Sequence, residues 1–296
     1  MLVGVVMVAA LVGASQGGAA PAKPNPNPAP AAAASPFSWA EVLEQNPDPK
    51  VVTDADFLKR ITETKLPWRV KDKASGMEML LVPPGEFMMG SPENEADRGK
   101  DETQHRVTIS KAFYLSQTEI PQEVWQKMLG ANRSAFKGSQ NPVETVSWND
   151  CQAFCGATGL RLPSEAEWEY ACRAGTTTPF SFGATITPQQ VNYNGNYPYG
   201  SAAKGLDRQK MVVCGSLSAN PWGFREMHGN VWEWCQDGYS ATASTTQEAD
   251  ETEIGARVLR GGGWDTSAIG CRASYRGSGA PSIRNSNIGC RFARTA

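Results

Sequence analysis

Glycine and proline are the residues that most restrict the folds open to this chain. The sequence has 29 glycines and 20 prolines in 296 residues, about one residue in six. Both residues interrupt helices and favour turns. This content favours a loop-rich fold over a helix bundle. Apolar residues make up 40% of the chain and charged residues 20%, which is enough apolar side chain for a core.

Charge and histidine content exclude several classes of function. The 28 basic and 30 acidic residues almost balance, so the sequence predicts no nucleic-acid partner and no anionic membrane surface. The only histidines are His105 and His228, which excludes a metal site with three histidines in this chain. Within residues 66–296, which contain both histidines, there is no G-x-S-x-G motif of the kind that a serine hydrolase would need.

The N-terminus predicts export and a linker. Residues 2–13 form an apolar run of signal-peptide length that is too short to span a bilayer comfortably, and small residues follow it. We expect a signal peptide at 1–20, a secreted or periplasmic location and no transmembrane segment after its removal. Residues 21–65 form a Pro/Ala-rich linker and a short helical segment, in which Asp54 caps a helix within 51–64.

The rest of the chain, 66–296, reads as one domain with short elements. We expect strands at 77–82, 105–109 and 112–115. Helices are predicted at 121–129, from 148 and from 163. At the last of these, Ser164 and Glu167 have the spacing of a capping box. Residues 173–230 read mostly as turns, so the pattern indicates an α+β domain with long loops.

Seven sequence blocks resemble the formylglycine-generating enzyme, or sulfatase-modifying factor, family (FGE-sulfatase domain). They include MEMLLVPPGEFMMGS (77–91), RLPSEAEWEYACRAG (161–175), MHGNVWEWC (227–235), RVLRGGGW (257–264) and NIGCRFAR (287–294). The resemblance implies a domain of low secondary-structure content, a variant of the C-type-lectin fold. It also implies a monomer that acts on a protein or peptide.

Enzymes of this family oxidise a sulfatase cysteine to formylglycine, using two cysteines that bind copper(I). The second cysteine corresponds to Cys271, but the first falls on Thr266, and an expected serine falls on Gly263. A hydroxyl is a poor ligand for copper(I). Trp232 matches the tryptophan that lines the family's site. The resemblance therefore predicts an atypical member in which copper binding and oxidase activity are doubtful, with Cys271 either a remaining catalytic thiol or a structural one.

The resemblance also bears on the seven cysteines, an odd number. The family joins the helix cysteine matching Cys155 to a position that falls on Phe292, and Cys290 stands two residues earlier. A Cys155–Cys290 disulfide is therefore expected. The family partner of Cys172 falls near Arg276, which leaves Cys235 or Cys271 as its candidates.

Calcium is the metal that the resemblance favours. One site would take its ligands from the GNVWEW block and its preceding acid, and oxygen ligands suit this ion. The alternative for Glu233 is a salt bridge to a C-terminal arginine. A second site would use Asn192 and Tyr193 with Asp207 as the acid. The ligands expected for the first site are Glu226, Gly229, Val231 and Glu233.

Three functions remain to be compared. The first is the family's oxidase. The second is a non-catalytic, calcium-stabilised, lectin-like module that binds a peptide, a glycan or a protein partner. The third is an iron-dependent sulfoxide synthase of the same family, which two histidines argue against.

Overall fold

The structure is a computed structural model that describes residues 37–252 and 255–296. The predicted signal peptide and the linker up to residue 36 lie outside this part. Residues Pro36–Ala296 make up one compact unit. None of the helices in the described ranges has the length and apolar character needed to cross a bilayer.

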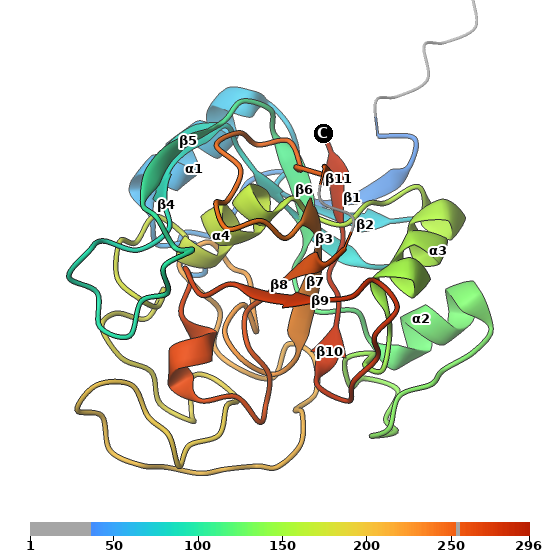
Figure 1. Cartoon of the computed structure of the whole chain (residues 1–296). Coiled ribbons are helices and arrows are strands. Elements are labelled where there is room, and N and C mark those ends of the chain that lie inside the picture. The colour runs from blue at the N-terminus through green and yellow to red at the C-terminus, as the bar shows by residue number, and fades with distance from the viewer. Residues whose placement is uncertain (1–36, 253–254) are drawn as a thin grey trace, which may run out of the picture. The chain divides into compact units, whose positions relative to one another are not determined.

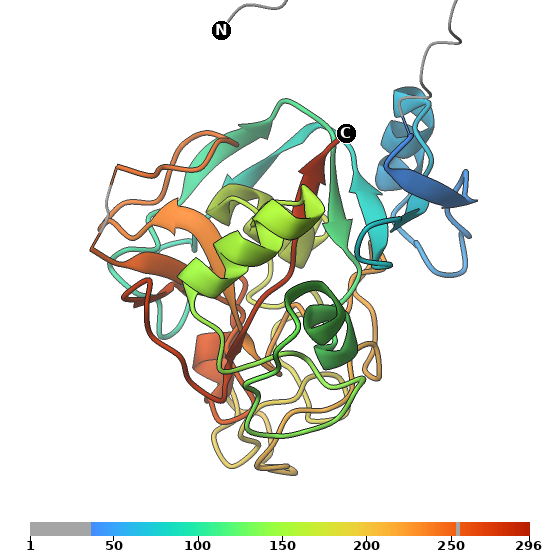
Figure 2. The ribbon, with the colours of Figure 1, turned by 90° about the vertical axis from the view of Figure 1, so that its right-hand side faces the viewer.

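Of the four short α-helices in the described residues, three begin at a side-chain cap. Asp54 accepts a hydrogen bond from the Phe57 amide at the start of α1, and Ser164 and Glu167 form the predicted capping box of α4. Helices α2 and α3 pack against each other (Figures 1 and 2). The helices of the described residues are α1 (Ala55–Thr64), α2 (Gln122–Leu129), α3 (Trp148–Thr158) and α4 (Glu165–Arg173).

An antiparallel sheet joins the two ends of the described chain. Its order is β1-β2-β3-β6-β11, and β11 pairs through Ala293↔Leu115 with β6. The predicted strands at 77–82 and 112–115 are its centre, and Leu80, Leu81 and Leu115 are fully buried there. The strands are β1 (Ala40–Glu44), β2 (Arg69–Asp72), β3 (Glu78–Val82), β6 (Phe113–Ser116) and β11 (Ala293–Thr295).

Two smaller sheets complete the unit. One has the order β10-β7-β8-β9 and holds the GNVWEW block. The other is the hairpin of β4 (Gly85–Met89) and β5 (His105–Ile109). The strands of the former are β7 (Trp232–Gly238), β8 (Arg257–Arg260), β9 (Gly277–Gly279) and β10 (Ile288–Gly289).

The segment 37–65 packs on the same unit. Strand β1 pairs with β2, and the ring of Phe57 stacks on Trp222 with centroids 4.2 Å apart. The Trp222 indole also donates to Asp54 at 3.0 Å. Figure 2 shows β1 and α1 together at one edge of the unit. The sequence alone did not predict whether residues 37–65 pack on the domain.

Long loops between α4 and β7 gather at the lower end of Figure 1, drawn in yellow to light orange. The mixture of short helices, small sheets and loops confirms the predicted mixed helix-and-sheet class. These loops enclose a separate buried apolar cluster, which contains Phe180, Tyr193, Tyr199, Ala268 and Cys271. This cluster is where the candidate site lies.

Candidate functional site

A glycine pair shapes the loop around Cys271. After β8 the chain passes through Gly261 and Gly262 with φ of +92° and +79°, a region that side chains with a Cβ rarely adopt. A Cβ on Gly262 would lie 2.7 Å from the Cys271 sulfur. The Cys271 thiol therefore fits against Gly262 because this residue has no side chain. Cys271 itself ends the 3₁₀ turn η1 (Ala268–Cys271).

The Cys271 thiol is completely buried. Burial raises its pKa well above the ordinary value, and Asp265 adds to the shift, while the Gly229 amide partly offsets it. The thiol therefore stays protonated at neutral pH. A protonated thiol is a weak nucleophile, and a metal ion would have to displace its proton to bind there.

Thr266 and Trp232 meet Cys271 around Gly270. The Thr266 hydroxyl accepts a hydrogen bond from the Gly263 amide at 3.0 Å, and its methyl group lies 2.4 Å from where a Gly270 Cβ would stand. The Trp232 ring lies 3.9 Å from the same point. The predicted residues are thus brought together. They do not fit a two-thiolate copper(I) site, because a hydroxyl engaged with backbone replaces the first thiolate.

His228 is a residue of this site that the sequence did not place. Its Nε2 accepts from the Ser181 amide at 3.1 Å, so Nδ1 carries the proton and donates to the Cys271 carbonyl at 2.7 Å. Burial lowers its pKa to about 4 and Arg173 contributes, although the bond to Cys271 opposes the shift. A neutral His228 therefore fixes the Cys271 backbone. Its place in the MHGNVWEWC block was the available signal.

Glu233 of the expected first calcium site is bound by protein groups. Its carboxylate accepts from Arg291 Nε at 2.6 Å and Nη2 at 2.7 Å, and from the Trp168 indole at 2.6 Å. This is the salt bridge to a C-terminal arginine that the sequence offered as the alternative.

The other expected ligands of that site face different partners. The Glu226 carboxylate accepts from the amides of Gly215 and Leu217 at 2.9 and 3.0 Å. The Val231 amide donates to Glu119 at 3.1 Å. In the structure, the carboxylates of Glu226 and Glu233 therefore do not converge on one point.

Glu119 is a further buried acid that the sequence did not single out. Burial raises its pKa, and the neighbouring charges of Glu233 and Glu226 raise it further against the pull of Arg291. Of these three carboxylates, only that of Glu233 is hydrogen-bonded to Arg291, and this arrangement favours a proton on Glu119. The contacts of Glu119 with Asn230 and Val231 join segments more than a hundred residues apart.

The second expected calcium site keeps one free oxygen. Asn192 is fully buried and donates to Asn230 Oδ1 and the Lys210 carbonyl at 3.0 Å each. Its own Oδ1 is buried without a hydrogen-bond partner among the described residues. Asp207 instead accepts from Asn196 and the Gln209 amide, and the Tyr193 hydroxyl donates to Ile186. No cluster of three acidic, cysteine or histidine side chains placed for a metal occurs in the described ranges.

The cysteines correct the predicted pairing. All seven are free thiols in the described structure, so the expected Cys155–Cys290 bond is not formed. The Cys290 thiol instead makes a hydrogen-bond contact with Cys151. Cys172 lies 3.6 Å from His228 Nε2 and bonds neither Cys235 nor Cys271.

Arg276, near which the family partner of Cys172 falls, forms a buried ion pair. Its guanidinium donates to both oxygens of Glu165 at 2.7 and 2.9 Å. This pair ties Arg276 to the first turn of α4. The sequence did not predict that Arg276 pairs with Glu165.

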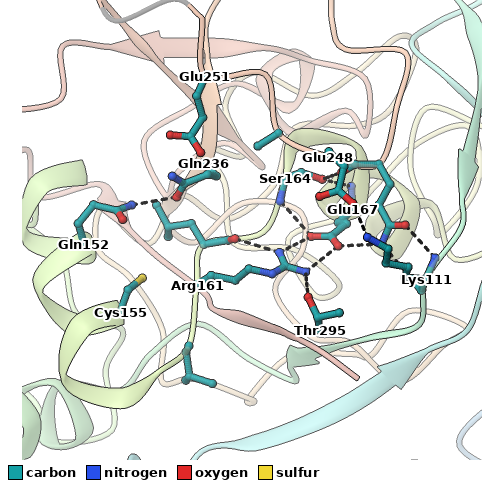
Figure 3. Close-up of a pocket in the computed structure, with 14 residues that line it drawn as sticks. Lys111, Gln152, Cys155, Arg161, Ser164, Glu167, Gln236, Glu248, Glu251 and Thr295 are labelled. Carbon is teal, nitrogen blue, oxygen red and sulfur yellow. Dashed lines mark hydrogen bonds and ion pairs between the residues drawn. The ribbon is translucent and has the colours of Figure 1, made fainter.

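A polar hollow of about 460 Å³ lies elsewhere, beside α3 (Figure 3). Arg161 and Glu167 form a double ion pair across it at 2.6 and 2.8 Å, and Gln152 donates to Gln236 at 2.9 Å. The side chains of these two pairs therefore have hydrogen-bond partners within the hollow. Cys155 lines the wall, whereas Cys271, Thr266 and Trp232 do not.

Comparison with known proteins identifies the domain. Residues 65–296 match the family described as Sulfatase-modifying factor enzyme 1-like domain (FGE-sulfatase). The "Inactive C-alpha-formylglycine-generating enzyme 2" of Bos taurus is 31% identical over 252 residues, 83% of this chain and 75% of that protein. The "Formylglycine-generating enzyme" of Streptomyces coelicolor is 37% identical over 185 residues, 58% of each protein.

Solved structures share the fold of this domain. The structure of PvdO from Pseudomonas aeruginosa superimposes with a TM-score of 0.67 at 29% identity, over 77% of this chain and 98% of that one. Treponema denticola variable protein 1 shares the fold with a TM-score of 0.63 at 24% identity. The family match covers most of the chain and agrees with the seven sequence blocks. The chain therefore belongs to the sulfatase-modifying factor (formylglycine-generating enzyme) family.

Proposed function

We propose that this domain is a non-catalytic member of its family, a lectin-like module that binds a peptide or protein partner. The observation that carries the proposal is the pair Thr266 and Cys271. One thiol is fully buried and protonated, and the group opposite it is a hydroxyl that accepts a backbone hydrogen bond. The family's chemistry needs two thiolates, so this pair offers only one of the two sulfur ligands.

The relatives support the same proposal. The family contains proteins named as formylglycine-generating enzymes and proteins named as inactive ones, and the chain is similar to both. The residues at positions 266 and 271 support the inactive alternative. A substrate-binding surface persists without chemistry when only the reactive groups are lost.

Exposed apolar side chains near the site favour a peptide or protein as the partner. Tyr197 is 62% exposed, and its backbone carbonyl accepts from Ala268 at 3.0 Å, which places it beside the η1 turn. Leu206 and Val213 of the same loops are also exposed. Aromatic and aliphatic groups of this kind bury well against a peptide. A glycan partner is the alternative.

Calcium and export belong to the proposal as well. The unpartnered Asn192 oxygen is the kind of group that a cation would satisfy, and this supports a calcium site at Asn192 and Tyr193. The apolar run at 2–13 supports secretion or periplasmic export. Copper is not part of the proposed module.

A labelled cysteine-containing peptide of the sulfatase type tests both halves of the proposal. Fluorescence polarisation measures binding, and mass spectrometry after incubation with copper(I) and oxygen measures conversion of the cysteine to an aldehyde. We expect binding without conversion, weakened about tenfold or more by Tyr197→Ala. The control Val42→Ala also removes an exposed apolar side chain, on β1. Conversion contradicts the non-catalytic assignment, and absence of binding contradicts the peptide partner.

A further inference from the structure

Two stacked rings fix how α3 lies against the C-terminal segment. Phe154 and Phe292 stack with centroids 4.5 Å apart and planes 9° from parallel. Both residues are fully buried. Phe292 leads directly into β11, and the Arg161 amide and carbonyl pair with Ala293 just after the helix. The stack and this pairing therefore set the register between the helix and the segment.

Cys151 and Cys290 meet one step before the stacked rings. Cys151 precedes Phe154 by three residues, about 4.5 Å along a helix, and Cys290 precedes Phe292 by two, about 6.6 Å along an extended chain. The two thiols are in hydrogen-bond contact, and both side chains are completely buried. Two thiols in contact inside a rigid core are already close enough to be joined.

Cys155 is placed differently, although it lies only one turn further along α3. It is half-buried and lines the polar hollow beside Arg161 (Figure 3). Burial raises its pKa to about 12, so its thiol is unreactive at neutral pH.

We propose that Cys151 and Cys290 form a disulfide bond when the chain folds under oxidising conditions, and that Cys155 remains the free thiol. The oxidant is a small-molecule disulfide. One cysteine thiolate attacks it and releases one thiol, and the second cysteine then displaces the other thiol from the mixed disulfide. Two protein thiols are oxidised to one disulfide, and one disulfide is reduced to two thiols. Because both groups are buried in the folded domain, the exchange takes place during folding.

The bond would join α3 to the segment that carries Arg291. Cys290 precedes Arg291, whose guanidinium holds Glu233, and the Cys290 carbonyl accepts from Ile120 at 3.1 Å. The cross-link would close a long loop of the chain and thereby restrict the unfolded state. It would therefore stabilise the packing of α3 on the C-terminal segment, and neither cysteine belongs to the apolar cluster that contains Cys271.

Peptide mapping of the refolded full chain tests the proposal. The reduced, denatured protein is refolded in a buffer of oxidised and reduced glutathione, alkylated and digested with trypsin without reduction. We expect peptide 285–291 to be joined to peptide 138–161, and the joined mass to disappear on reduction. Both peptides recovered fully alkylated in the wild-type protein would overturn the proposal.

Peptide 138–161 contains both helix cysteines, so matched variants decide between them. The Cys155→Ala protein should keep the joined peptide at wild-type yield, whereas Cys151→Ala should lose it. Loss of the link in Cys155→Ala would overturn the assignment and favour Cys155–Cys290. As an independent measurement, reduction should lower the melting temperature of the oxidised wild-type and Cys155→Ala proteins by about 10 °C. An unchanged melting temperature also counts against the bond.

Discussion

The carboxylate of Glu233 accepts hydrogen bonds from Nε and Nη2 of Arg291 at 2.6 and 2.7 Å, and both side chains are buried. The pair joins the GNVWEW block on β7 to the C-terminal NIGCRFAR block. Arg291 also donates to the carbonyls of Ser116 and Arg225. One guanidinium therefore ties together the segments that surround the candidate site.

Arg291→Met should reduce the free energy of unfolding by about 3–5 kcal/mol, because it leaves a buried carboxylate without its partner. The control is Lys111→Met, which removes an exposed ion pair with Glu248 and should cost no more than about 1 kcal/mol. Urea denaturation measures both. Equal losses in the two variants would show that the buried pair is not a main support of the fold.

Gly262→Ala should destabilise the domain by about 3 kcal/mol, through a φ of +79° and a Cβ only 2.7 Å from the Cys271 sulfur. The control is Gly130→Ala, which has a similar φ of +74° but no atom within 4 Å. It should cost about 1–2 kcal/mol. Adding Cys271→Ala should recover part of the loss in Gly262→Ala, as a double-mutant cycle of unfolding free energies would reveal. Additive losses would contradict the contact.

His228 should make stability fall in mild acid. Burial lowers its pKa from 6.5 to about 4, so the unfolded chain takes up the proton first as pH falls. The contribution is fully present above pH 6.5 and is lost as pH falls through about 4, amounting to about 3 kcal/mol. Unfolding free energies measured from pH 7 to pH 4 should show this fall in the wild type and a shallower one in His228→Gln. Parallel curves would contradict a buried neutral histidine.

Calcium removal should lower the melting temperature if the unpartnered Asn192 oxygen binds the ion. A ligand that binds only the folded state stabilises it by mass action, and at 100 times its dissociation constant the gain is about 3 kcal/mol. Adding a chelator to calcium-loaded protein should therefore shift melting by several degrees, and Asn192→Ala should abolish the shift. A wild-type melting curve that ignores the chelator counts against the site.

Local signals in the sequence predicted most of the helices but few of the long-range contacts. The Asp54 cap and the Ser164 capping box act over three residues, so they can be recognised from spacing alone. The family blocks likewise located Cys271, Thr266 and Trp232. The helix caps and the family blocks can be recognised because each is formed by residues close together in the sequence.

The remaining contacts depend on which distant segments meet. The pairing of Cys290 with Cys151 follows from the stack of Phe154 on Phe292, which no spacing reveals. Glu119 reaches the GNVWEW block from 111 and 112 residues away. The sequence offered several C-terminal arginines as partners of Glu233, and the structure pairs it with Arg291. Tertiary packing decides each of these.

The central claim is that a missing thiol at position 266 leaves the site without chemistry. Its most direct test compares the wild-type domain with Thr266→Cys and the control Thr266→Ser, measuring copper(I) bound per protein and the mass of a cysteine-containing sulfatase-type peptide. We predict that the wild-type and Thr266→Ser proteins bind no copper(I) at position 271 and leave the peptide unchanged, while Thr266→Cys gains copper(I) binding. Stoichiometric copper(I) binding and peptide oxidation by the wild-type protein, both lost in Cys271→Ala, would contradict the account.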